Sequence, residues 1–123
     1  MTRRPLWYLA TPYTQHPRGF GAAYTDACLI SAGLMQRGVE VFSPIAHSHG
    51  IAAHSSIGET DHEFWLRYDL LLVDVCLGLI VVEIDGWEQS YGISVEVAEF
   101  KRQGKPIVHL PPDQAQRLLG KKE

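Results

Sequence analysis

The sequence predicts one α/β domain: a Rossmann-like, flavodoxin-like three-layer sandwich whose parallel sheet has four or five strands in the order 2-1-3-4. Two observations predict this fold. Short apolar segments alternate with longer segments of helical periodicity, and strands that alternate with helices form parallel sheets with right-handed crossovers. The segment GLIVVEI, residues 78–84, is apolar almost throughout, which is typical of a central strand covered on both faces.

The composition limits the class of protein. The 123 residues suit a single domain, residues 1–123, and 46% of them are hydrophobic, which suffices for one core. A net charge of −3 gives no basic field for a nucleic acid polymer. The longest apolar run is broken by Asp74, and the run after the basic start is too short for a signal peptide. We therefore expect a cytoplasmic protein without a membrane partner, and two buried free thiols, Cys28 and Cys76.

The first part of the chain predicts a helix between two strands. LWYLA, residues 6–10, is an apolar run that TPYT ends, and VEVFSP, residues 39–44, alternates before a proline. The helix between them ends at Gly38. Its buried face is predicted from apolar residues at three- and four-residue spacing, which are Ala23, Ala27, Ile30 and Leu34.

A loop and a second helix follow. Residues 45–60 combine glycines, serines and histidines, and their length predicts a functional loop or lid. Thr60 or Asp61 can cap a helix that runs through HEFWLRYDLLLVDVC. Its predicted buried face carries Phe64, Leu72 and Val75, with Tyr68 on the same stripe.

The last part predicts two more strands and a third helix. After the strand at 78–84, DGWEQ forms a turn, and Ser90 begins a helix that Gly104 ends. KPIVHL, residues 105–110, is the fourth strand, and residues 111–123 can form a short terminal helix with a frayed basic end. The core face of the third helix is predicted to carry Ile93, Val97 and Phe100.

The predicted topology also locates a ligand. Its winding reverses between the first and third strands, and open α/β sheets bind ligands outside the carboxyl ends of their strands at such a point. Two loops meet there, TPYTQHPRG at residues 11–19 and DGWEQSYG at residues 85–92. We expect the ligand between these loops.

Glu96 is the main catalytic candidate. Helical side chains lean toward the N-terminus over the residue four positions back, and here that residue is Gly92, which leaves bare space. Glu96 can then reach the cleft as a nucleophile or base. Ser90 and the free N–H groups at the helix start can hold an anion. The alternatives are a surface glutamate and a plain N-cap serine.

Other side chains can complete the site. Asp69 can supply a second carboxylate as general acid or base, or be an exposed helix aspartate. Tyr8 and Tyr13 flank the end of the first strand, where Pro12 fixes the turn. Tyr13 can project into the cleft, and Trp87 can stack on a planar base. The alternatives are packed aromatic residues and a rim residue that covers the core.

Four histidines lie in the segment before the second predicted helix and at the start of that helix. The motif HSH can begin a metal site, but no recognised ligand spacing completes it. We therefore assign no metal ligand and interpret the segment as a polar loop over the cleft. The histidines are His47, His49, His54 and His62, with Asp61 beside the last.

Three blocks carry a family resemblance over roughly residues 6–110. YLATPYT, then S-Y-G-I-S-V-E at a helix start, then GKPIV resemble the nucleoside 2-deoxyribosyltransferase superfamily. The YLA-P-Y and GW-S-G-E blocks are most similar to the domain-of-unknown-function 1937 family. The Ser-x-Gly-x-x-x-Glu spacing resembles the 2′-deoxynucleoside 5′-phosphate N-hydrolases, whereas YLA-x-P looks closer to the transferases.

The resemblance implies a role for each matched residue. Glu96 would be the nucleophile at the anomeric carbon of the sugar. Ser90 and the backbone around Gly92 would hold its 5′ end, either hydroxyl or phosphate. Asp69 would protonate or position the leaving base. The residues that would orient the carboxylate or the ribose are Tyr8 and Tyr13. The resemblance also implies a homo-oligomer, a dimer or larger, and no cofactor.

The chain departs from these relatives in several places. Thr11 stands where the pattern YLAGP has a glycine, and Leu77 stands where an aspartate often precedes the third strand. The Gly/Arg-rich phosphate loop of the hydrolases is missing, although Arg18 can substitute for it. An inserted GW precedes Ser90. We still expect Thr11 and Pro12 among the residues that bind substrate.

Together these observations predict an enzyme that cleaves the N-glycosidic bond of a nucleoside or nucleoside 5′-monophosphate through a glycosyl-enzyme. Hydrolysis is slightly favoured over transfer to another base, because the serine-to-glutamate spacing is nearer to the hydrolases. One alternative is a non-catalytic nucleotide-binding sensor or regulatory module on the same fold. Another is metal-dependent hydrolysis by the histidine segment.

Overall fold

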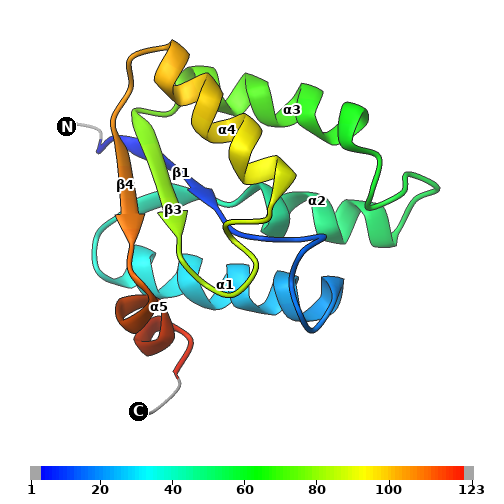
Figure 1. Ribbon diagram of the computed structural model, residues 1–123, viewed down its shortest axis with the longest axis horizontal. Coiled ribbons are helices and arrows are strands. Elements are labelled where there is room, and N and C mark those ends of the chain that lie inside the picture. Colours follow the sequence, from blue (N-terminus) through cyan, green and yellow to red (C-terminus); the bar gives the residue numbers. More distant parts are fainter. Residues whose placement is uncertain (1–3, 121–123) are drawn as a thin grey trace.

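The computed structural model describes residues 4–120 and has a four-stranded parallel sheet between two helical layers (Figure 1). The fold and strand order predicted from the sequence are confirmed, with the order β2-β1-β3-β4. The basic end expected at residues 121–123 lies outside the described residues. The strands are β1 Leu6–Ala10, β2 Glu40–Phe42, β3 Gly78–Val82 and β4 Ile107–Leu110. The helices are α1 Phe20–Gln36, α2 Pro44–Ala53, α3 His62–Val75, α4 Tyr91–Arg102 and α5 Pro112–Leu118.

The alternation of side chains along the strands builds one core on each face of the sheet. Leu79 and Val81 of β3 belong to the core that α3 and α4 cover, whereas Ile80 and Val82 belong to the core beneath α1 and α5 (Figure 1). All five residues of β3 are buried, as expected of a central strand. The predicted buried face of the first helix is confirmed, since Ala23, Ala27, Ile30 and Leu34 are all buried.

Residues 44–53 form a helix, α2, where a loop was predicted. The Ser43 side chain caps this helix by accepting a hydrogen bond from the Ala46 N–H. Pro44 occupies the first turn, where its missing N–H leaves no helical hydrogen bond unmade. The prediction of a loop over residues 45–60 was therefore wrong for its first part, and only the segment from 54 to 61 is irregular.

The orientation of α3 also differs from the prediction. Asp61 caps the helix by accepting from the Phe64 N–H, which confirms one of the two expected caps. Val73 is buried, however, whereas Tyr68 is 45% and Val75 is 67% exposed. The stripe assigned to the core was therefore wrong at these two positions. The physical reason is that α3 is apolar on more than one side, and another side faces the sheet and a cavity.

Two expectations from the composition concern thiols and membranes. Cys76 is buried and Cys28 is partly exposed, and both are free, so only Cys76 is a buried thiol as expected. Within residues 4–120, no helix combines the length and apolar character that crossing a bilayer requires.

Candidate functional site

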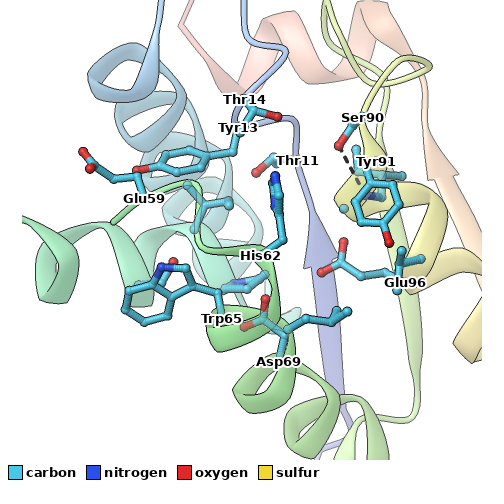
Figure 2. A pocket seen from close by; sticks show the side chains of 17 residues that line it. Thr11, Tyr13, Thr14, Glu59, His62, Trp65, Asp69, Ser90, Tyr91 and Glu96 are labelled. Atoms are coloured by element: carbon cyan, nitrogen blue, oxygen red, sulfur yellow. Dashed lines mark hydrogen bonds between the residues drawn. The ribbon is translucent and has the colours of Figure 1, made fainter. Parts of the chain in front are cut away.

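An open cavity lies at the carboxyl ends of β1 and β3, where the winding of the sheet reverses. Its walls come from the loop after β1, the start of α2, the inner side of α3 and the first turns of α4 (Figure 2). The polar and aromatic side chains that line it include Thr11, Tyr13, Glu59, Trp65, Asp69, Tyr91 and Glu96. The structure therefore brings six of the predicted site residues to one cavity: Thr11, Tyr13, Asp69, Ser90, Gly92 and Glu96.

Glu96 is the buried carboxyl of this cavity. It is 6% exposed, and the Tyr8 hydroxyl donates a hydrogen bond to its Oε2 atom. The space above Gly92 is open, since a Cβ added there would meet only the Ser90 Oγ atom, at 3.9 Å. Figure 2 shows the Glu96 side chain reaching from α4 toward the side chains of α3. The carboxyl thus reaches into the cavity past Gly92, which has no side chain to block it.

Burial raises the pKa values of Glu96, Asp69 and Tyr8. Burial raises the pKa of Glu96 to about 8, although the hydrogen bond from Tyr8 acts in the opposite direction, and the nearby Asp69 raises it further. Burial likewise raises the pKa of Asp69 to about 7. The pKa of the Tyr8 hydroxyl lies well above its usual value, because it is buried and faces Glu96. The cavity therefore holds two carboxyls that can exchange protons near neutral pH.

Two such carboxyls can act as an acid and a nucleophile at once. They interact, so their protons belong to the pair rather than to one residue. The Tyr8 hydroxyl favours the ionised form of Glu96, because it donates to that carboxyl. No side chain donates to Asp69 within residues 4–120. At neutral pH the higher pKa of Glu96 keeps the proton of the pair mainly on Glu96, and the hydrogen bond from Tyr8 reduces the free-energy cost of moving that proton to Asp69.

Hydroxyl and N–H groups surround the upper part of the cavity. Ser90 caps α4, and its Oγ atom accepts a hydrogen bond from the Ile93 N–H at 3.2 Å. The Thr11 Oγ1 atom is buried and has no hydrogen-bond partner within residues 4–120. A buried hydroxyl that lacks a partner costs free energy, and a polar ligand atom in the cavity can relieve that cost.

The remaining predicted site residues lie in different environments. The Tyr13 ring stacks on Phe20 with centroids 4.6 Å apart, and its hydroxyl shares a hydrogen bond with His49 Nδ1 at 2.6 Å. Burial raises the pKa of Tyr13 to about 12. Pro12 is fully buried and is not among the residues that line the cavity. Trp87 also lies outside the lining and packs against the core beneath α3 and α4.

The histidines of the segment interpreted as a polar loop over the cleft pack against different aromatic neighbours. His49 stacks on Tyr24 with centroids 4.6 Å apart, His47 packs against Phe42, and His62 packs against Tyr91. His47 and His49 have different neighbours, because residues two apart on a helix point in different directions. In the described part of the chain, no group of three or more His, Cys, Asp and Glu side chains is arranged to hold a metal ion.

A comparison with known families assigns the chain to one of them. The family described as Domain of unknown function (DUF1937) matches residues 5–111. The chain belongs to the DUF1937 family. The matched region of this DUF1937 domain runs from β1 through β4 and contains every residue that lines the cavity. A search of curated proteins gave no match.

The site of this DUF1937 domain includes residues that sequence reasoning missed. Trp65 and Tyr91 give the cavity aromatic walls, and Glu59 adds a third carboxyl (Figure 2). Trp65 lies four residues before Asp69, so helical spacing from that aspartate could have found it. Glu59 lies in the irregular segment before α3, where no periodicity relates it to the site.

Arg18, the residue considered as a substitute phosphate ligand, is engaged elsewhere. Its guanidinium donates to the Asp26 carboxylate at 3.1 Å, and its backbone N–H donates to His16 Nδ1 at 3.1 Å. Asp26 also contacts His16 Nε2 at 2.7 Å. In the described residues, no Lys or Arg lines the cavity of this DUF1937 domain.

Proposed function

We propose that this protein cleaves the N-glycosidic bond of a nucleoside, with Glu96 as the nucleophile and Asp69 as the acid. The observation that carries the proposal is the placement of Glu96. Its carboxyl is 6% exposed, accepts a hydrogen bond from Tyr8, and lines the same cavity as Asp69. A carboxyl pair with pKa values shifted toward neutrality is a common arrangement for glycosidic bond cleavage.

The proposed reaction has two halves. In the first, the Glu96 Oε1 atom attacks the anomeric carbon while the carbon–nitrogen bond breaks. The base leaves with the electron pair of that bond and takes the proton of Asp69. In the second half, the Asp69 carboxylate removes a proton from water, the water oxygen bonds to the anomeric carbon, and Glu96 leaves as a carboxylate. A second base can replace water, and the product is then a new nucleoside.

Tyr8 positions the nucleophile in this scheme. Its hydroxyl bonds to Oε2, which leaves Oε1 free to attack. Tyr8 itself is fully buried and does not line the cavity. It therefore acts through Glu96 rather than on the substrate.

The walls of the cavity suit the two ends of a nucleoside. Trp65 and Tyr91 provide aromatic surface from opposite sides, α3 and α4, on which a base can stack (Figure 2). Thr11 Oγ1, which has no partner within residues 4–120, and the Ser90 end of α4 provide hydrogen-bonding groups for the sugar.

The charges of the cavity favour a nucleoside over a nucleoside 5′-monophosphate. Glu59, Asp69 and Glu96 line the cavity, and its lining within residues 4–120 contains no Lys or Arg. A phosphate carries nearly two negative charges and is usually met by cationic side chains. The N–H groups at the start of α4 are then the main donors available to it.

Incubation with a panel of nucleosides and their 5′-monophosphates, followed by chromatography for free base, tests the proposal. We expect base release from at least one nucleoside, and slower release from its monophosphate. Glu96→Ala should abolish release, whereas Glu88→Gln, at an exposed glutamate outside the cavity lining, should not change it. Release that survives in the Glu96→Ala variant would refute the mechanism. Nucleoside binding without any release would instead support a sensor or regulatory module.

A further inference from the structure

Glu59 is a carboxylate of the cavity that the proposed reaction does not use. It is partly buried, and Figure 2 shows it with Trp65 on the side of the cavity away from Glu96 and Ser90. Among the hydrogen bonds and ion pairs within residues 4–120, none involves Glu59. A cavity carboxylate that has no protein partner can accept hydrogen bonds from a ligand.

A tight turn fixes where Glu59 lies. The Gly58 carbonyl accepts from the Asp61 N–H at 3.1 Å and from the Trp65 indole N–H at 2.9 Å. The first hydrogen bond closes the turn around Glu59, and the second joins that turn to α3. The position of Glu59 at the N-terminal end of α3 is therefore held by hydrogen bonds.

Three chemically different groups follow one another along this wall of the cavity. They are the Glu59 carboxylate, the Trp65 ring and the Asp69 carboxyl. Trp65 and Asp69 are four residues apart and share one face of α3. Asp69 comes seven residues after His62, the first residue of the helix, so at about 1.5 Å per residue it lies roughly 10 Å along the axis from the helix start. The wall thus has room for an extended planar group between its two carboxyls.

The end of the cavity near Glu59 offers hydrogen-bond acceptors. Burial and the nearby Glu59 raise the pKa of Tyr13 to about 12, so the Tyr13 hydroxyl keeps its hydrogen at neutral pH. When the His49 ring carries its hydrogen on Nε2, Tyr13 donates to Nδ1, and the Tyr13 oxygen is left to accept from a ligand. A carboxylate such as Glu59 only accepts. This end of the cavity therefore suits a ligand edge that donates hydrogen bonds.

We propose that Glu59 selects the base of the nucleoside, and that the preferred base is guanine. This inference rests on the nucleoside cleavage proposed above, with the glycosidic nitrogen at Asp69 and the base on Trp65. On the edge away from its sugar, guanine carries a ring N–H beside an exocyclic amino group. Two parallel N–H donors fit the two oxygens of one carboxylate. Adenine and cytosine present an acceptor beside the amino group, and a pyrimidine also reaches less far from Asp69 toward Glu59.

The ratio of rates for guanosine and inosine tests the inference, because inosine differs only in lacking the exocyclic amino group. We expect kcat/KM for base release from guanosine to exceed that from inosine about tenfold to a hundredfold, and the same for the 2′-deoxy forms. Glu59→Gln should bring the ratio near one, because the amide nitrogen of glutamine cannot accept from the amino group. Glu63→Gln, at an exposed glutamate of α3 outside the cavity lining, should keep the wild-type ratio.

Calorimetric binding separates the guanine preference from the cleavage mechanism. The Glu96→Ala variant, which should not cleave, should still bind guanosine about tenfold or more tightly than inosine. If the wild type releases no base but shows this preference, and Glu59→Gln loses it, then the cleavage mechanism fails and the guanine preference stands. Equal binding of the two nucleosides, a preference that survives in Glu59→Gln, or no binding of either nucleoside overturns the role of Glu59.

Discussion

Replacing Glu96 with glutamine tests the physical basis of the site. Glutamine keeps the shape of the side chain and an oxygen that accepts from Tyr8, but it cannot ionise. Burial raises the pKa of Glu96 from 4.5 to about 8, so the folded protein favours the neutral carboxyl. The stability from this preference is fully present below pH 4.5 and is lost as the pH rises toward 8.

The size of the effect follows from the shift. Each pKa unit corresponds to about 1.4 kcal/mol, so a rise from 4.5 to about 8 corresponds to roughly 5 kcal/mol of lost stability well above pH 8. At pH 7 most of that loss is already present, and the wild type should be less stable than the Glu96→Gln variant by roughly 3 kcal/mol. Near pH 4 the two proteins should differ little.

Urea unfolding at several pH values, followed by tryptophan fluorescence or circular dichroism, measures this difference. Glu88→Gln is the matched control, because Glu88 is an exposed glutamate in the turn before α4. Its stability should follow that of the wild type. If the wild type and the Glu96→Gln variant show parallel stability curves across this range, then Glu96 is not a buried acid with a raised pKa. The proposed nucleophile would then lose its physical support.

Three further substitutions test single features. Tyr8→Phe removes the hydrogen bond that lowers the pKa of Glu96. The rate of base release should then rise at a higher pH than in the wild type, and an unchanged pH profile would exclude this effect of Tyr8 on Glu96. Gly92→Ala should stabilise α4 by about 1 kcal/mol in thermal melts, because its Cβ meets open space, yet slow base release if substrate occupies that space. Gly86→Ala should destabilise the fold by roughly 1–3 kcal/mol in urea, because φ is 100° and the new Cβ would lie 2.3 Å from the Gln15 carbonyl oxygen; wild-type stability would contradict this.

The sequence predicted best those elements whose apolar residues can be buried in only one way. The run at 78–84 must be buried on both faces, which placed β3 at the centre of the sheet. The face of α1 was read correctly, because its buried residues share one apolar stripe. Ser90 was identified as the cap of α4, and Glu96 as a carboxyl beside the core face, from spacing alone.

Other features depend on contacts that spacing does not encode. In α3, periodicity identified an apolar stripe but could not tell whether the sheet or another surface covers it, so Tyr68 and Val75 were assigned to the wrong side. In α2, the Ser43–Pro44 start was present in the sequence, but glycine and histidines suggested a loop. Trp87 was placed at the ligand because its turn lies nearby, whereas its ring packs on the core.

The two-sided character of α3 links the outside of the molecule to its interior chemistry. Tyr68, which is 45% exposed, directly precedes Asp69, whose carboxyl faces the cavity. A small rotation of this helix about its axis would move both side chains together. Because burial raises the pKa of Asp69, any such rotation that changed the solvent exposure of this carboxyl would also change its pKa.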